Sequence, residues 1–127
     1  MLEKDLLRSF LVGGLICVIG QLILNGFTAL DLSEQDAAAA TSVSLVFLSA
    51  VLTGLSVYDD IAKFAGAGTL VPITGFANAV VSPAIEFKAE GFVTGMAAKM
   101  FIIAGPVIVY GTVASVLYGL ILVIFGG

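Results

Sequence analysis

The residues best suited to chemistry lie in an interrupted apolar segment, Phe64–Asn78, which reads FAGAGTLVPITGFAN. Its glycines and proline disfavour a continuous helix. Two half-helices meeting there would leave free backbone N–H groups, which attract carboxylates, and free carbonyl groups, which attract cations. The segment therefore predicts a solute path, with these candidate lining residues: Gly66, Gly68, Thr69, Pro72, Thr74, Gly75 and Asn78. The alternative is a kinked helix whose glycines let a neighbouring helix pack closely.

Three charges precede this segment and could form the mouth of such a path. They are Asp59, Asp60 and Lys63. Adjacent carboxylates on a helix do not face each other, so a paired acid/base or metal site is disfavoured. We expect interfacial charges that pair with Lys63 or with another subunit.

Catalytic groups are scarce. The sequence has no histidine and a single cysteine, Cys17, placed within an apolar run without an activating base. The Gly66–Gly68 stretch lacks the spacing of a phosphate-binding loop. We therefore expect no enzyme, no catalytic residue, no metal ligand set and no cofactor.

Composition points to the lipid bilayer. Of the 127 residues, 60% are hydrophobic and only 11% are charged, whereas soluble domains are about 25% charged. The net charge of −4 and the scattered cations exclude a nucleic-acid surface. The sequence predicts an all-α integral membrane protein with a single membrane domain, 1–127.

The elements that must position the candidate residues follow from the lengths of the apolar runs. A bilayer core of about 30 Å needs about 20 helical residues. We expect three to four hydrophobic segments: spans at about 9–30, 38–58 and 100–125, a Gly/Pro-broken re-entrant element at 64–82, and an amphipathic interfacial helix at about 85–99.

Cation placement favours a re-entrant hairpin for 64–82. Lys4, Arg8, Lys63 and Lys88 all lie on the cytoplasmic side only if this segment enters and leaves through the same surface. A full crossing is the alternative, and it would place Lys88 outside.

Small and polar residues recur along the expected spans. Gly13 and Gly20 share a helical face, as do Gln21 and Asn25. Helix packing is the default interpretation, with a solute contact at Gln21 as the alternative. Two further sets are read first as packing seams: Ser42, Ser49 and Ser56 in the second span, and Gly111, Ser115 and Gly119 in the last.

Several long blocks in order resemble a known family. They are LVGGLICVIGQLIL, LTGLSVYDDI, FAGAGTLVPITGFANAVVSPAIEFKAEG and KMFIIAGPVIVYG. Together they resemble the stage V sporulation protein A membrane subunits of the SpoVAC/SpoVAEb family, and VYDDIAKFAGAG with EFKAEGF and IAGPVIVYG is most similar to the SpoVAC type. The similarity covers about Phe10 to Leu120.

The resemblance implies a multi-pass protein of the spore inner membrane that acts in the SpoVA complex. Such a protein forms part of the channel or transporter for dipicolinic acid, with calcium, during sporulation and germination. Implied partners are the lipid bilayer, a homologous membrane subunit, a soluble cytoplasmic subunit and dipicolinate. Two alternatives stay open: a tension-gated non-selective channel, and a non-conducting scaffold subunit.

Overall fold

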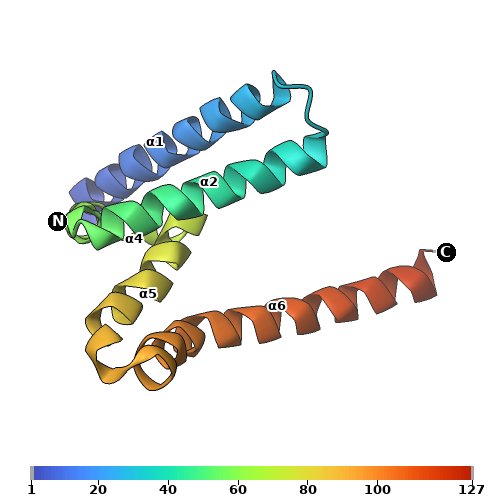
Figure 1. Ribbon diagram of the computed structural model, residues 1–127. Helices are drawn as coiled ribbons and strands as arrows, with labels where there is room; N and C mark the ends of the chain where they lie inside the picture. Colours follow the sequence, from blue (N-terminus) through green and yellow to red (C-terminus); the bar gives the residue numbers. More distant parts are fainter. Residues whose placement is uncertain (1, 127) are drawn as a thin grey trace. The chain divides into compact units, whose positions relative to one another are not determined.

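The computed structural model describes residues 2–126, whose regular elements are all helices (Figure 1). Three of them are long and apolar enough to cross a membrane: α1 (Leu2–Thr28), α2 (Glu34–Gly54) and α6 (Ala98–Phe125). The expectation of an all-α membrane protein is thus confirmed. The chain forms two compact units, one up to Ser82 and one from Pro83 onward, which are described separately.

In the first unit, α1 and α2 lie side by side and run in opposite directions (Figure 1). The short connection between them forces an antiparallel pair. The Ser33 side chain caps the start of α2, because its Oγ accepts a hydrogen bond from the Asp36 backbone N–H at 3.2 Å and donates one to Asp36 Oδ2 at 2.7 Å. A polar cap of this kind satisfies a backbone donor that the first helical turn leaves free.

After α2 the chain breaks into short helices, α3 (Val57–Ala65) and α4 (Ala67–Leu70), followed by α5 (Ile73–Glu86). Gly66 separates α3 from α4 with φ +52° and ψ −122°, a conformation that a side chain would strain. Pro72 lies in the bend before α5. The interruption predicted from the sequence is present at these positions.

The second unit corrects one expectation. The single interfacial helix predicted at about 85–99 is wrong, because α5 ends at Glu86 and is followed by the 3₁₀ turn η1 (Lys88–Glu90), the π-helical turn η2 (Phe92–Ala97) and then α6. Gly91 has φ +106°, which a helix cannot accommodate. Across these turns, the Lys99 Nζ lies 3.9 Å from the centroid of the Phe87 ring.

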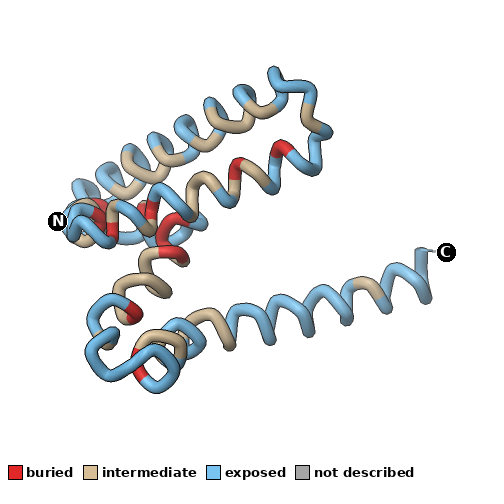
Figure 2. Tube along the Cα trace, in the orientation of Figure 1, coloured by how far each residue is buried: buried red, intermediate tan, exposed pale blue. Residues whose placement is uncertain are grey.

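Burial is the reverse of that in a soluble protein. The buried residues of the described chain are small or hydroxylated, with Tyr58 the exception in size, while many large aliphatic and aromatic residues are exposed. Figure 2 shows that buried positions are few along the backbone. Such a surface suits hydrocarbon surroundings, because lipid chains are as apolar as leucine. The interior is therefore set by close backbone approach and hydrogen bonds.

Candidate functional site

The path of the interrupted segment is fixed by two hydrogen-bonded pairs between α2 and α5. Ser49 Oγ donates to the Thr74 carbonyl oxygen at 2.6 Å, and Thr53 Oγ1 lies 2.7 Å from Asn78 Oδ1. Residue numbers rise together along both helices, so α2 and this part of α5 run in the same direction. The chain therefore leaves the C-terminal end of α2, reaches the level of Ser49 and returns along α5 toward that same end. A re-entrant hairpin follows such a path.

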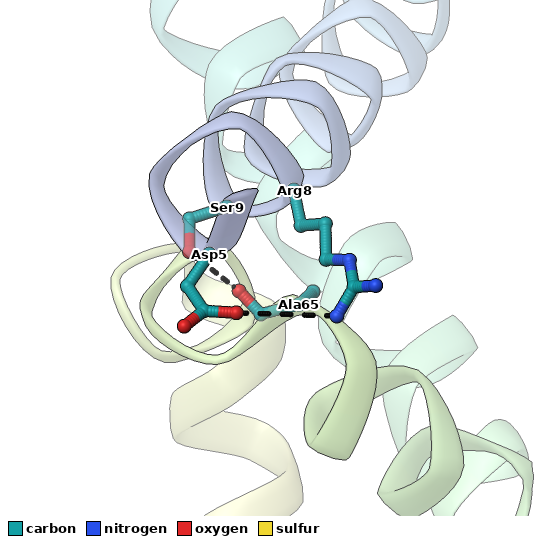
Figure 3. A network of polar contacts seen from close by, with 4 residues as sticks. All are labelled: Asp5, Arg8, Ser9 and Ala65. Atoms are coloured by element: carbon teal, nitrogen blue, oxygen red, sulfur yellow. Dashed lines mark hydrogen bonds and ion pairs between the residues drawn. The ribbon is translucent and has the colours of Figure 1, made fainter. Parts of the chain in front are cut away.

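The other arm of the hairpin packs on the start of α1. Ser9 Oγ donates to the Ala65 carbonyl oxygen at 2.7 Å, and Arg8 extends past the same turn toward Asp5 at 3.9 Å (Figure 3). The Arg8 guanidinium also lies 4.8 Å from the centroid of the Phe64 ring, within cation–π range. These contacts connect the last turn of α3 to the polar end of α1.

Glycines allow the arm to approach α1 backbone to backbone. A Cβ on Gly68 would lie 2.2 Å from the Ser9 carbonyl oxygen, and one on Gly13 would lie 3.3 Å from the Gly68 carbonyl oxygen. A Cβ on Gly75 would lie 2.1 Å from the Thr69 carbonyl oxygen. Gly68 and Gly75 therefore have a packing function: they close the hairpin on α1 and on itself.

The hairpin is shallow. Its deepest contacts are with Gly13 on α1 and Ser49 on α2, each five residues from Arg8 and from Gly54 respectively. At 1.5 Å per residue this is about 8 Å, roughly a quarter of a bilayer core. The candidate residues thus lie near one end of the α1–α2 pair, and not at its middle.

The candidate threonines belong to a buried polar network centred on Tyr58. The Tyr58 hydroxyl donates to the Thr69 carbonyl oxygen at 3.1 Å and lies 3.0 Å from Thr74 Oγ1. Thr69 Oγ1 donates to the Gly66 carbonyl oxygen at 2.9 Å. Among the described residues, no buried side-chain nitrogen or oxygen lacks a partner. The buried polar groups therefore bind one another.

The structure therefore brings most of the candidate lining residues together, but they form part of the buried interior and do not line an open path. Thr69, Thr74 and Gly75 are buried, while Gly66 is exposed at the break and Pro72 is half-buried in the bend. The sequence does not single out their hydrogen-bonding partners Thr53 and Tyr58, nor Ser9, which bonds to the neighbouring Ala65. The seven-residue serine repeat is the one sequence signal that points to Ser49, and it predicts a packing seam.

An apolar crevice of about 190 Å³ extends from this network between α1 and α2. Ser49, Tyr58 and Thr74 form its polar end, and aliphatic side chains form the rest of the wall. The lining residues from the two spans are Val12, Leu15, Ile16, Ile19, Leu45, Leu48 and Leu52. Because its wall is aliphatic, the crevice does not continue the polar network toward the midplane.

The charges expected at the mouth lie on α3. Lys63 Nζ is 3.2 Å from Asp60 Oδ1, an exposed pair within one helix, as predicted for interfacial charges. Asp59 is half-buried on the same turn. In the described part of the chain, histidine, cysteine and acidic residues form no group of three that could hold a metal ion.

The expected packing residues differ in what they contact. Gly20 faces the Leu45 side chain, where an added Cβ would lie at 3.4 Å. Gly111 and Gly119 have nothing within 4 Å of such a Cβ, and Ser115 Oγ donates to the Gly111 carbonyl oxygen of its own helix at 2.8 Å. Gly20 thus lies at the α1–α2 contact, while the small residues of α6 make no packing contact within the described part of the second unit.

The described residues contain three helices long and apolar enough to cross a membrane, and these define a multi-pass α-helical membrane protein. Residues 5–121 match the SpoVAC/SpoVAEB sporulation membrane protein family. The chain is also 50% identical over 115 residues to stage V sporulation protein AC of Bacillus subtilis (strain 168), which covers 90% of this chain and 77% of that protein. The chain therefore belongs to the SpoVAC/SpoVAEB family. No solved structure matches it significantly.

Proposed function

We propose that this chain is a membrane subunit of the SpoVA complex in the spore inner membrane and contributes to the passage of dipicolinic acid, with calcium, during sporulation and germination. It works beside a homologous membrane subunit and a soluble cytoplasmic one, and it carries out no catalysis. Family membership supports the assembly. The observation that carries a transport function is the shallow re-entrant hairpin with its buried polar network.

The chemistry of the solute suits this network. Dipicolinate carries two carboxylates, so its transfer into lipid without hydrogen-bond donors is prohibitive. Hydroxyl and amide groups at Thr69, Thr74 and Asn78, and the backbone around Gly66, supply donors without a fixed charge. Because these groups are bonded within the chain, we interpret this arrangement as a closed constriction. Opening requires that the hairpin separate from α2.

Thr53 is the point at which this proposal is best tested, because its hydroxyl connects α2 to Asn78 of the hairpin. Thr53→Val keeps the shape and removes the hydrogen bond, while Thr53→Ser keeps the hydroxyl. In a sporulating host, we expect Thr53→Val spores to leak or release dipicolinate faster than wild type and Thr53→Ser spores to behave as wild type. Spore dipicolinate content, release rate after germinant addition and abundance of the protein are measured together.

Two further variants address the solute path itself. Asn78→Leu removes the same hydrogen bond as Thr53→Val, and Gly68→Val forces the hairpin away from α1, so spores of both variants should accumulate less dipicolinate than wild type. Normal accumulation and release in both, at normal protein abundance, would show that the hairpin does not line the path.

A non-conducting scaffold is the second candidate, and it is favoured by the fact that the buried polar groups of the described chain are all mutually bonded. Reconstitution of the purified chain in liposomes separates the two. Dipicolinate efflux from these vesicles supports a conducting subunit. Absence of efflux, even after a partner subunit is added, supports a scaffold. Currents that open under suction without preference for dipicolinate indicate a tension-gated channel.

A further inference from the structure

We propose that α1 pairs with α1 of a second copy of this chain, in a parallel contact about a two-fold axis along the membrane normal. The contact uses one exposed face of the helix, here called the α1 seam. Its members recur with the alternating four- and three-residue spacing of a left-handed helix pair. They are Leu7, Leu11, Gly14, Val18, Gln21, Asn25 and Thr28, and all seven are exposed.

The two amides make the seam unsuited to lipid. Gln21 Nε2 donates to Asn25 Oδ1 at 2.9 Å, and among the described residues no other hydrogen bond reaches these two side chains. Gln21 lies 13 residues from Arg8 and 10 from Asp31, which is about 20 Å and about 15 Å along the helix. It is therefore near the middle of the bilayer core, where amide groups without partners are costly.

The opposite side of α1 is already occupied within the first unit. Gly13 meets Gly68 of α4, and Gly20 meets Leu45 of α2. Gly14, in contrast, has nothing within 4 Å of an added Cβ and leaves the seam open to close backbone approach. The free amides and the open glycine thus lie on a face of α1 that α2 and the hairpin do not cover.

The chemistry of the seam favours an identical partner. A carboxamide carries both a donor and an acceptor, so it is complementary to itself. Copies inserted with the same orientation can be related only by an axis along the membrane normal, which places each residue opposite its own equivalent. Asn25 would then face Asn25, at a position where a single asparagine fixes the register of parallel helix pairs.

Disulfide cross-linking tests the contact, because Cys17 is the single cysteine and any disulfide must join two chains. In a Cys17→Ser background, Val18→Cys places a thiol in the seam, and Leu15→Cys places one about a quarter-turn outside it. The two positions are matched in exposure, at 55% and 59%. Mild oxidation of the full-length protein in bilayers should yield a covalent dimer for Val18→Cys and little for Leu15→Cys.

The amide contribution is measured in the same background. Gln21→Leu with Asn25→Leu should lower the Val18→Cys dimer yield, with dimer affinity falling by roughly 3- to 30-fold per lost amide pair. Asn25→Gln, which keeps an amide, should retain most of the yield. A control substitution on α2, Leu45→Ile at the contact with Gly20, should leave the dimer yield unchanged.

Three results would overturn the proposal. The first is equal cross-linking at Val18→Cys and Leu15→Cys, which indicates random collision. The second is labelling of Val18→Cys by a membrane-impermeant maleimide without dimer formation, which indicates a water-lined face. The third is capture of Val18→Cys by a different membrane protein in place of its own copy. The inference requires only that α1 spans the membrane, so it can fail while the transport proposal stands, and the converse also holds.

Discussion

The close approach of Gly68 to α1 gives the sharpest test of how the hairpin is held. Gly68→Ala adds one Cβ that would lie 2.2 Å from the Ser9 carbonyl oxygen, 2.8 Å from Ser9 Cα and 2.9 Å from the Ser9 carbonyl carbon. All three are backbone atoms, so no side-chain rotation relieves the contact. Helices α1 and α4 must move apart by roughly 1 Å, which in overpacked interiors costs about 1–3 kcal/mol.

Separation of this size also weakens the Ser9–Ala65 hydrogen bond, now 2.7 Å. The gain in helix propensity from glycine to alanine offsets up to about 1 kcal/mol of the cost. The expected net effect is a free energy of unfolding lower by about 1–2 kcal/mol. Unfolding in mixed detergent–SDS micelles, followed by far-ultraviolet circular dichroism, measures it without the need for a tryptophan.

Gly26→Ala is the matched control, because it lies in α1 and an added Cβ there meets nothing within 4 Å. It should be neutral or stabilising by a few tenths of a kcal/mol up to about 1 kcal/mol. If Gly68→Ala proves as stable as Gly26→Ala, the close α1–α4 contact does not exist in the membrane and the account of the hairpin is wrong.

Three further variants test the same structure by the same unfolding measurement. Tyr58→Phe leaves the buried Thr69 carbonyl without the phenolic donor and should lower stability by about 1 kcal/mol, whereas an unchanged value would remove Tyr58 from the centre of the network. Ser33→Ala removes the cap of α2 and should cost about 1 kcal/mol, with Ser33→Asp, which retains an acceptor, restoring it. Lys63→Ala breaks only an exposed pair and should change stability by less than about 0.5 kcal/mol, and a larger loss would mean that this lysine is buried by a partner.

How far the sequence predicts this fold is clearest at the hairpin. The break itself was predictable, because glycines and a proline concentrated in one short segment disfavour a continuous helix, and Gly66 adopts a positive φ that glycine tolerates. Its depth was not. Whether a broken segment reaches the midplane or stays near the surface depends on which residues of α1 and α2 it touches, and that information lies in Ser9, Gly13 and Ser49, which precede the segment in sequence.

The partners of the candidate site were missed for a related reason. Serine and threonine within an apolar helix commonly bond to the carbonyl four residues earlier, as Thr41 does, and this masks the few that reach another helix. Thr53 does both, lying 2.7 Å from the Ser49 carbonyl oxygen and from Asn78 Oδ1. Periodicity in a single sequence cannot separate these uses.

The prediction of a helix after α5 was wrong for a different reason. Alternating charges and apolar residues around Lys88 and Glu90 fit an amphipathic helix, but that pattern takes no account of Gly91 and Gly95. A Cβ on Gly95 would lie 2.2 Å from the Phe87 carbonyl oxygen, so the chain folds tightly back where a helix would have continued. The backbone conformation at these two glycines, and not the charge pattern, decides that no continuous helix forms here.

These outcomes share one physical cause, which also sets where this protein is sensitive to mutation. In lipid, the burial of a large apolar side chain contributes little to helix association, because the chain leaves one hydrocarbon environment for another. Backbone approach and hydrogen bonds must then hold the hairpin, and both depend on small or hydroxylated residues such as Gly68, Ser49 and Thr53. Adding a single methyl group at Gly68 should therefore destabilise the first unit more than removing an exposed leucine such as Leu22, the opposite of the order in a soluble core.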